Sequence, residues 1–375
     1  GYDTKGANTV VVKAPKDQAV HYEIPDTREG WVEAIRLLID SYTGKNEVLF
    51  NFDLIRPAGS PIKGFGGTAS GPDPLKEGLR NIRELLDNNT GEPITSVVIT
   101  DVMNYIGKFV VAGNVRRSAE ISIGDIDDSD FIDMKDPVKF KEELLDRRWA
   151  SNNSVFATTD SDFSKVTDHI CRNGEPGLVF LENSRHYGRL RDGWNDETSE
   201  KYDRVDGYNP CGEQSLRSYE LCCLVETYPA NHETPEEYWE TLKYAYLYAK
   251  SVTLLPTHNE RTNEVMLQNR RIGLSQSGIQ QAIKKFGHAR YFSEFCDRAY
   301  KQVKHWDLVY SRWLGIPHSN KRTTVKPSGT VSLLAGATPG VHCTHSEFYL
   351  RTVRVSGSSE YIRPLLNAGY RIEYD

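Results

Sequence analysis

The stretch GYNPCGE, residues 207–213, places a cysteine between an amide side chain and a carboxylate, each two residues away from it. Residues two apart face the same side of a β-strand. In a turn, the proline and the glycine of this stretch would fold the same polar groups toward the sulfur. Either conformation is expected to bring a thiol, a hydrogen-bonding amide and a possible base close together.

The chemistry expected at Cys211 differs from that of a nucleophilic cysteine. A cysteine nucleophile usually has a histidine as its activating base, and no histidine lies near Cys211 in the sequence. Glu213 instead puts a negative charge beside the thiol, which disfavours the thiolate. We expect Cys211 to react as a neutral S–H group through its hydrogen atom, and the alternative is an inert buried cysteine.

The NPCGE segment, with Cys222 eleven residues after its cysteine, resembles the finger loop of the ribonucleotide reductases. More specifically, it resembles that of the adenosylcobalamin-dependent (class II) ribonucleoside-triphosphate reductases. The segment at residues 25–31 is similar to the inserted region of the monomeric class II enzymes, which favours that subgroup. The agreeing segments, in family order, are PDTREGW (25–31), IRPAGSPIKGFGGTASGP (55–72), VVAGNVRRSAE (110–120), RRWASNNSV (147–155), NGEPG (173–177), NRRIGLSQSGIQ (269–280) and TTVKPSGTVSLLAG (323–336).

Strands and helices are expected to alternate along the chain, which indicates an α/β fold. The resemblance implies a ten-stranded α/β barrel of the ribonucleotide reductase type, with a central finger loop that carries Cys211. It also implies an inserted effector-site region at residues 1–50, a catalytic barrel core at residues 51–375, and further chain beyond both termini.

The resemblance also implies the chemistry. Adenosylcobalamin is the implied cofactor, and Cys211 carries the thiyl radical that removes the 3′ hydrogen of a ribonucleotide. Glu213 accepts the 3′-hydroxyl proton, Asn209 holds the 2′ and 3′ hydroxyls, and Cys222 supplies electrons with a partner cysteine. The implied partners are a ribonucleotide substrate, a deoxynucleotide or ATP effector, and a thioredoxin-like or dithiol reductant.

A glycine-rich segment at residues 64–71, GFGGTASG, formally fits a dinucleotide-binding fingerprint. That fingerprint needs a strand directly before it and a helix directly after it, whereas prolines flank this segment on both sides. A loop fits better, either a bare surface loop or, as the resemblance implies, the first specificity loop near the effector. The effector-site candidates here are Lys63, Gly64, Gly66 and Gly67.

The stretch RRWASNN, residues 147–153, combines two cations, an indole and two amides. Such groups can stack on a base, bind its edges and pair with phosphate, and a solvated charged segment is the alternative. The resemblance implies the second specificity loop, with Arg147, Arg148, Asn152 and Asn153 at the effector site.

A further candidate site is the turn at residues 327–330, between a predicted strand and a predicted helix. Free N–H groups at a helix N-terminus bind anions, and a glycine lets the backbone approach a phosphate closely. The residues alone also allow simple N-capping by a hydroxyl. The resemblance implies that Ser328, Gly329 and Thr330 bind the substrate phosphates.

Periodic apolar residues predict the main elements. Asp26 is the expected N-cap of the first helix, with Glu29 completing a capping box. The predicted elements are helices over residues 31–38, 98–112, 235–255 and 331–334 and strands over residues 47–52, 118–124 and 323–325.

Composition narrows the class of protein. The chain has 375 residues, 38% of them hydrophobic, and a net charge of −6, so it lacks the basic signature of a nucleic-acid-binding protein. No apolar run is long enough to span a bilayer. Six cysteines without a CxxC pair indicate neither a zinc site nor a disulfide framework. We therefore expect a cytoplasmic enzyme with no bound metal ion of its own.

Two alternatives stay open at this point. One is a reductase core whose radical comes from a separate subunit, and the other is a non-catalytic fragment that binds nucleotides. If the family assignment is right, Cys222 should be a free thiol, unbonded to Cys171, Cys296 or Cys343.

Overall fold

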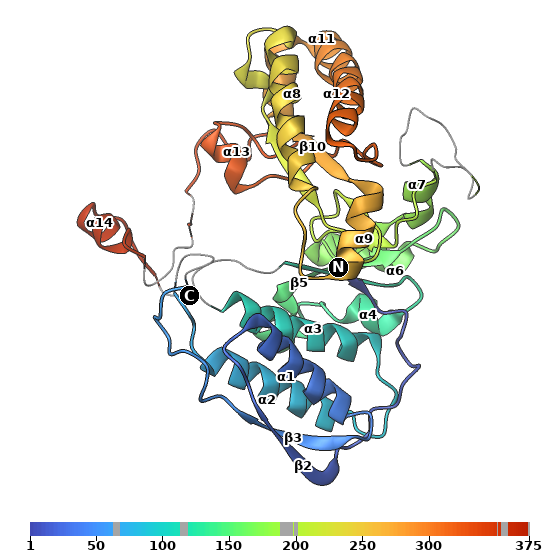
Figure 1. Cartoon of the computed structure of the whole chain (residues 1–375), viewed down its shortest axis with the longest axis vertical. Coiled ribbons are helices and arrows are strands. Elements are labelled where there is room, and N and C mark those ends of the chain that lie inside the picture. The colour runs from blue at the N-terminus through green and yellow to red at the C-terminus, as the bar shows by residue number, and fades with distance from the viewer. Residues whose placement is uncertain are drawn as a thin grey trace. The chain divides into compact units, whose positions relative to one another are not determined.

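The computed structural model describes residues 1–62, 68–112, 119–187, 198, 202–350, 352–353 and 359–373 (Figure 1). The chain divides into two compact units. The N-terminal unit comprises Tyr2–Val179 with Arg351–Asp375, and the finger-loop unit comprises Phe180–Leu350 with Gly1. The effector-site candidates Lys63, Gly64, Gly66 and Gly67 lie outside the described residues.

The N-terminal unit contains two parallel sheets, one in the order β1-β4-β5-β6 and one that pairs β2 with β3. Its strands are β1 (Tyr2–Asp3), β2 (Lys16–Glu23), β3 (Asn46–Asn51), β4 (Glu120–Asp125), β5 (Ser151–Phe156) and β6 (Gly177–Val179). Its helices are α1 (Arg28–Ser41), α2 (Asp73–Asp87), α3 (Ser96–Val111), α4 (Ser129–Asp133), α5 (Lys141–Asp146), the 3-10 helix η1 (Arg148–Ala150), α6 (Ser164–Asn173) and α14 (Ile362–Asn367). Parallel neighbours need crossover connections, and helices lie in these connections.

Helix α1 begins at a different cap from the predicted one. Thr27 has extended backbone angles, and its hydroxyl oxygen accepts a hydrogen bond from the Gly30 N–H at 3.0 Å. This is N-cap geometry, so the prediction of Asp26 is wrong. The Asp26 carboxylate instead accepts from Arg56 Nε at 2.5 Å. The predicted apolar face of α1 is confirmed, since it is buried in a core shared with α2 and α3.

The finger-loop unit contains a parallel pair of strands, β9 and β10, and a short antiparallel hairpin, β7–β8. Its strands are β7 (Gly207–Tyr208), β8 (Ser215–Leu216), β9 (Cys223–Thr227) and β10 (Ile272–Gln276). Its helices are α7 (Leu181–His186), the 3-10 helix η3 (Pro229–Asn231), α8 (Pro235–Val252), α9 (Glu260–Asn269), α10 (Ile279–Phe286), α11 (His288–Arg290), the π-helix η4 (Tyr291–Arg298), α12 (Ala299–Leu314) and α13 (Thr330–Leu334).

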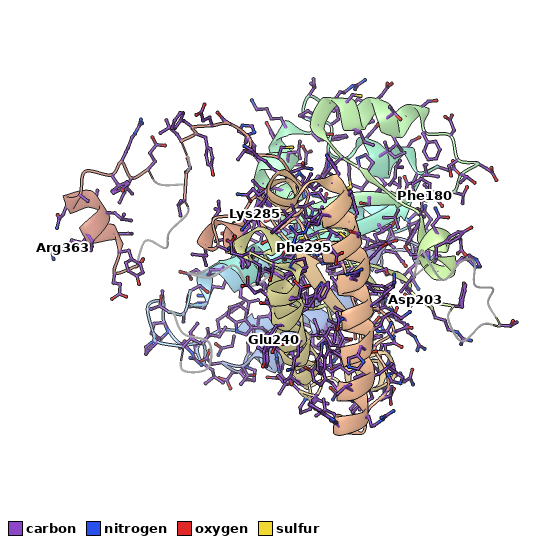
Figure 2. All side chains as sticks on the ribbon, turned by 90° about the horizontal axis from the view of Figure 1, so that it is seen from above. Phe180, Asp203, Glu240, Lys285, Phe295 and Arg363 are labelled. Carbon is purple, nitrogen blue, oxygen red and sulfur yellow. The ribbon has the colours of Figure 1, made fainter. Side chains whose placement is uncertain are left out.

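Helix α8 is the best-specified element of this unit. The Thr234 hydroxyl accepts from the Glu237 N–H, and the Glu237 carboxylate accepts from the Thr234 N–H, so the helix starts with a capping box. Its apolar stripe between residues 238 and 249 is buried against η4 and α12. Phe295, which is fully buried, lies among these crowded side chains in Figure 2. The predicted helix and its packing face are therefore confirmed.

The predicted strand at residues 323–325 is wrong, because the segment keeps only one bridge, between Thr323 and Leu274 of β10. The ladder ends there since the next donor, the Lys326 N–H, bonds to the Ser275 hydroxyl instead of a main-chain carbonyl. The predicted helix at residues 331–334 is present as α13.

The fold is mixed α/β. Within the described residues, the strands form four separate sheets of two to four strands, so the ten-stranded barrel stays a prediction. None of the described helices is both long and apolar enough to cross a lipid bilayer.

Candidate active site

The sequence GYNPCGE forms one side and the tip of the β7–β8 hairpin. Two hydrogen bonds close the tip: the Asn209 N–H donates to the Gln214 carbonyl at 3.0 Å, and the Gln214 N–H donates to Asn209 Oδ1 at 2.9 Å. Gly212 has a φ of 77°, in the left-handed region that favours glycine. The turn therefore holds Cys211 at the tip, with Asn209 and Glu213 on either side of it.

Cys211 is exposed, whereas the side chain of Glu213 is only 3% exposed. Lys326 brings a charge that the sequence did not predict. Its Nζ lies 3.1 Å from Glu213 Oε1 and 3.9 Å from Cys211 Sγ. Because Lys326 is 115 residues from Cys211, no local pattern could indicate this contact. The thiol therefore has a cation beside it as well as the predicted carboxylate.

Cys222 lies next to the hairpin tip, where its Sγ accepts a hydrogen bond from Asn209 Nδ2 at 3.7 Å. Burial, with a further contribution from the charge of Glu213, raises the pKa of Cys222 to about 12. Cys223 is buried in other surroundings, where burial and the charge of Glu220 raise its pKa to about 11. Neighbouring residues point to opposite faces of extended chain, and only Cys222 faces Asn209.

None of the six cysteines, all of which lie in the described residues, forms a disulfide bond. The expected absence of a bond from Cys222 to Cys171, Cys296 or Cys343 is therefore what the structure shows. Cys222 stays a neutral thiol because of its raised pKa. It can thus donate a hydrogen atom or a proton to a neighbouring group.

The two oxygens of Glu213 differ in their hydrogen bonding to the described residues. Its Oε1 accepts from Lys326, while its Oε2 is buried without any hydrogen-bond partner among the described residues. Leaving a buried acceptor unpaired costs about 1–3 kcal/mol, so such an atom calls for an explanation. A hydroxyl group of a bound ligand would satisfy it.

A second acidic side chain, Glu226, lies on β9 near this pair. Its Oε1 accepts from the hydroxyls of Ser275, at 3.1 Å, and Ser277, at 2.7 Å. Burial raises the pKa of Glu226, and the charge of Glu213 adds to that shift. Among the described residues, Glu213 and Glu226 thus both place a carboxylate near Lys326.

The turn at residues 327–330 lies next to the same cluster, since Lys326 immediately precedes it. Ser328 is buried, and Gly329 is the N-cap of α13 without any side-chain cap bond. The alternative of hydroxyl N-capping is thus not what the structure shows. Apart from its chain neighbours, no described residue comes within 4 Å of the position that a Cβ on Gly329 would take, so the backbone is open to a ligand here.

The arginines of the second predicted specificity segment are already paired. Arg148 is buried, and its Nε and Nη2 donate to the two oxygens of Asp101, each at 2.9 Å. Arg147 Nη2 donates to Asp101 Oδ2 at 2.8 Å, and its Nη1 lies 3.4 Å from Asp146. Carboxylates thus pair with both arginines, and their role at an effector site stays a prediction.

The same segment is not a loop, since it forms η1 and the start of β5. Asn152 is exposed, whereas Asn153 is 3% exposed and its Oδ1 accepts from the Ser151 hydroxyl at 2.9 Å. Both residues belong to β5, so exposure alone separates the two amides: the side chain of Asn152 can meet a ligand directly, and that of Asn153 is buried.

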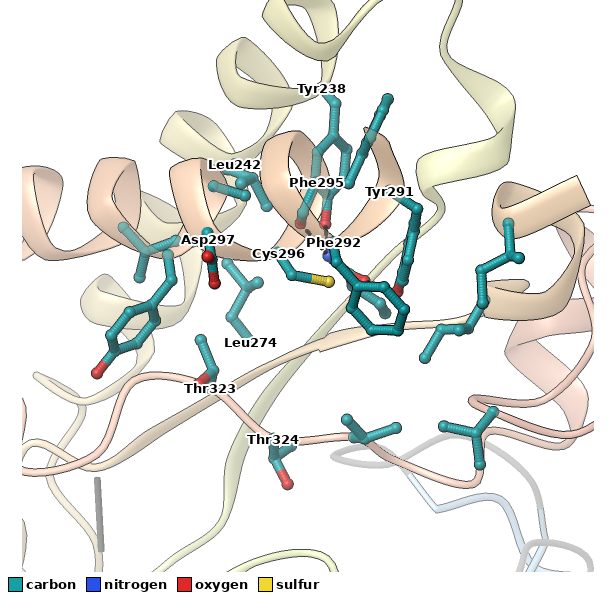
Figure 3. Close-up of a pocket in the computed structure, with 18 of the residues that line it drawn as sticks. Tyr238, Leu242, Leu274, Tyr291, Phe292, Phe295, Cys296, Asp297, Thr323 and Thr324 are labelled. Atoms are coloured by element: carbon teal, nitrogen blue, oxygen red, sulfur yellow. Dashed lines mark hydrogen bonds between the residues drawn. The ribbon is translucent and has the colours of Figure 1, made fainter. Parts of the chain in front are cut away.

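A pocket of about 630 Å³ lies behind the residues 323–325 segment (Figure 3). Side chains of η4, such as Phe292 and Cys296, line one side, and the segment that carries Thr323 and Thr324 lies across the pocket from them. Cys211, Glu213 and Cys222 are not among its lining residues, within the part of the chain that the structure describes. The lining is mainly apolar, and three of its polar side chains, Tyr238, Gln276 and Tyr291, are hydrogen-bonded to one another.

Comparison with known proteins agrees with the cluster at the hairpin tip. Residues 4–86 match the family model for the insertion domain of B12-dependent ribonucleotide reductase. The chain is 48% identical over 391 residues to a probable adenosylcobalamin-dependent ribonucleoside-triphosphate reductase of Dictyostelium discoideum. It is similar, over its whole length, to class II ribonucleotide reductases. The corresponding enzyme of Euglena gracilis is 45% identical over 376 residues.

The structure agrees with this similarity to class II ribonucleotide reductases. A crystal structure of a B12-dependent (class II) ribonucleotide reductase superposes with a TM-score of 0.76 at 39% identity, covering 86% of this chain and 48% of that one. Each of the two relatives is matched over 100% of this chain and 51% of its own length. The chain thus spans about half the length of the curated relatives it matches.

Proposed function

We propose that this chain forms the catalytic core of an adenosylcobalamin-dependent ribonucleoside-triphosphate reductase of the monomeric subgroup. The observation that carries the proposal is the hairpin-tip cluster, in which an exposed Cys211 lies beside Glu213, with Cys222 close by. The names of the relatives support the reaction and the cofactor.

The residues at the hairpin tip fit a large organic cofactor. Cys211 is exposed, whereas Glu213 and Cys222 are largely covered. A bulky group can therefore reach the sulfur of Cys211 without disturbing the base or the second thiol. When bound, adenosylcobalamin supplies the radical chemistry that takes the hydrogen atom of the Cys211 thiol.

The remaining steps are assigned to the side chains of this chain. The thiyl radical on Cys211 removes the 3′ hydrogen of the ribose, and Glu213 Oε2 accepts the 3′-hydroxyl proton. The 2′ hydroxyl leaves as water, and Cys222 with a partner cysteine supplies two electrons and two hydrogens, forming a disulfide. Of these two hydrogens, one leaves in the water and the other adds to C2′. Glu213 returns its proton to the 3′ oxygen, and Cys211 returns its hydrogen to C3′, which regenerates the thiyl radical. A dithiol or a thioredoxin-like protein then reduces the disulfide.

We assign Asn209 a less direct role in binding the ribose hydroxyls than the family resemblance implies. Its Oδ1 accepts from the hairpin backbone, and its Nδ2 donates to Cys222 Sγ. We assign it the role of holding the hairpin and the second thiol in place, while its remaining amide hydrogen can reach a ribose hydroxyl.

The other sites complete the proposal. Ser328, Gly329 and Thr330 bind the substrate phosphates, and Asn152 contacts a deoxynucleotide or ATP effector. Residues 1–50 form the effector-site region, and residues 51–375 belong to a ten-stranded barrel. The protein works in the cytoplasm.

The test is a turnover assay on the purified protein with a ribonucleoside triphosphate, adenosylcobalamin and a dithiol, with each omitted in turn. The proposal predicts formation of the deoxynucleotide only when all three are present. Turnover that needs a second protein instead of adenosylcobalamin would favour a reductase core served by a separate radical-generating subunit. Nucleotide binding without any turnover would favour the non-catalytic fragment.

A further inference from the structure

Lys326 is a cation in contact with two of the reactive groups, and the proposed function gives it no role. Its Nζ contacts Glu213 Oε1 at 3.1 Å and Cys211 Sγ at 3.9 Å. An ammonium group has three donors, so it can serve both contacts at once. Burial alone would lower the pKa of Lys326, but the hydrogen bond and the charge of Glu213 raise it. The side chain is therefore a permanent cation at neutral pH.

We propose that Lys326 is a positioning residue for ribonucleotide reduction, which holds Oε1 of Glu213 and thereby presents Oε2 to the sugar hydroxyl. The inference rests on the proposed function for the reaction itself. Oε2 is buried without a partner among the described residues, so it is the oxygen left for the substrate. Lys326 acts through Glu213 and does not touch the reacting atoms of the sugar.

The backbone around Lys326 is built to hold this position. The Thr324 hydroxyl donates to the Glu213 carbonyl at 2.6 Å, so the same segment holds the main chain and the side chain of Glu213. The Lys326 N–H donates to the Ser275 hydroxyl at 2.8 Å. On another side, a Cβ at Gly340 would lie 2.6 Å from the Lys326 carbonyl oxygen, so Gly340 packs directly against it.

A fixed position of the Glu213 carboxylate matters for its proposed role as the base. A general base must lie within hydrogen-bond reach of the proton that it accepts, and a misplacement of about 1 Å can cost about 100-fold in rate. An unrestrained carboxylate would rotate about its last bond and offer either oxygen. Lys326 also lies two residues before Ser328, so one segment sets the distance between the proposed phosphate turn and the base.

Kinetics of two variants test the proposal. Lys326→Met should lower kcat by about 10- to 100-fold and change KM for the ribonucleotide by less than about threefold, because the residue orients the base and does not bind substrate. Lys326→Arg should recover most of the rate, since it restores the cation. A matched control is Lys285→Met, because Lys285 is 32% exposed and paired with Glu233 at 2.8 Å, while Lys326 is 30% exposed.

Three kinetic results would overturn the proposal. They are an unchanged kcat in Lys326→Met, a loss that appears in KM instead of kcat, or an equal loss in the Lys285→Met control. A rise in KM would indicate that Lys326 binds the substrate phosphates.

A second measurement does not depend on turnover or cofactor. The rate of alkylation of Cys211 by iodoacetamide, followed by mass spectrometry of its peptide, should fall about 3- to 10-fold in Lys326→Met, because the variant loses the ammonium that lies 3.9 Å from the attacking sulfur. Lys326→Arg and Lys285→Met should keep the wild-type rate. If the wild-type protein does not reduce ribonucleotides, the proposed function fails, while these rates still decide whether Lys326 controls the Cys211–Glu213 pair. Equal alkylation rates in all variants would contradict it.

Discussion

Asp307 and Glu213 are both almost fully buried carboxylates of the finger-loop unit, but their hydrogen bonding differs. Asp307 Oδ1 accepts from Tyr246 at 2.9 Å and from Lys250 at 2.8 Å, and its Oδ2 accepts from Arg322 at 2.8 Å. Glu213 accepts from Lys326 through one oxygen only. Both oxygens of Asp307 therefore accept hydrogen bonds, whereas Oε2 of Glu213 accepts none from the described residues.

The two carboxylates also differ in the charged groups that surround them. Asp307 is a single carboxylate with two cations, Lys250 and Arg322, and it joins α8, α12 and the segment after α12. The surroundings of Lys326 hold two carboxylates, Glu213 and Glu226. Buried polar groups in structural sites are usually all paired, and departures from that rule mark candidate functional sites. The comparison therefore separates an anchor from a reactive centre.

Removing the anchor should have the largest effect on stability. Asp307→Ala leaves Lys250 and Arg322 buried without their counter-charge, and the free energy of unfolding should fall by about 3–5 kcal/mol. Urea unfolding followed by circular dichroism measures this loss. A loss below about 1 kcal/mol would show that Asp307 is not a structural anchor.

A substitution beside Lys326 should have the next largest effect. Gly340 has a φ of 48°, and a Cβ there would meet the Lys326 carbonyl oxygen at 2.6 Å. Gly340→Ala should cost about 1–3 kcal/mol in stability and should also lower turnover, because it displaces Lys326. Gly329→Ala is the control, since nothing lies within 4 Å of its added Cβ and its φ is negative; it should leave stability nearly unchanged. Equal losses in the free energy of unfolding for the two variants would contradict the proposed packing of Gly340 against Lys326.

The pH dependence of the free energy of unfolding should have opposite signs for Asp307 and for Glu226, the second carboxylate near Lys326. Burial would raise the pKa of Asp307, but Lys250 and Arg322 hold it below its usual value of 3.8. Asp307 therefore contributes stability that is present above that value and is lost as the pH falls through the lower folded pKa. Burial raises the pKa of Glu226 above 4.5, so its ionisation costs stability as the pH rises through that range.

Two variants check these signs. Asp307→Asn should lower the urea midpoint at pH 7 more than at pH 3. Glu226→Gln should raise the midpoint at pH 7 relative to wild type and change it less at pH 4. Shifts of the same sign at pH 7 would show that both carboxylates are structural.

The smallest effect on stability should come from the reactive carboxylate itself. Glu213→Gln should change the free energy of unfolding by less than about 1 kcal/mol, because its partner Lys326 is partly exposed and can be hydrated. Turnover should nevertheless fall by about 100- to 10,000-fold, since the proton acceptor is lost. Comparing melting temperature with turnover for this variant sharpens the contrast with Asp307. A large drop in melting temperature would place Glu213 with the anchors.

The sequence predicted what depends on neighbouring residues. Cys211 and Glu213 share a tight turn, and the alternation of extended chain separates Cys222 from Cys223. The apolar stripe of α8 follows from helical spacing, and its burial is confirmed. These features are local, so periodicity and turn chemistry are enough to predict them.

Partner choice between distant residues could not be predicted. Lys326 meets Glu213 across 113 residues, and Arg148 meets Asp101 across 47. Both lysine and arginine are ordinary surface residues in a sequence, and only the fold shows which carboxylate each one pairs with. The short-range cap choice at Thr27 was also missed, because two adjacent polar residues can each cap a helix.

The central claim is that Cys211 supplies the hydrogen atom that starts ribonucleotide reduction. The most direct test is deoxynucleotide formation by Cys211→Ser in the presence of ribonucleoside triphosphate, adenosylcobalamin and dithiol, with nucleotide affinity and melting temperature measured on the same sample. A serine O–H bond is too strong to exchange its hydrogen in this way. We predict no detectable product, with unchanged nucleotide affinity and melting temperature. Turnover within about tenfold of the wild-type rate, a difference of about 1.4 kcal/mol in barrier, would contradict the role of Cys211.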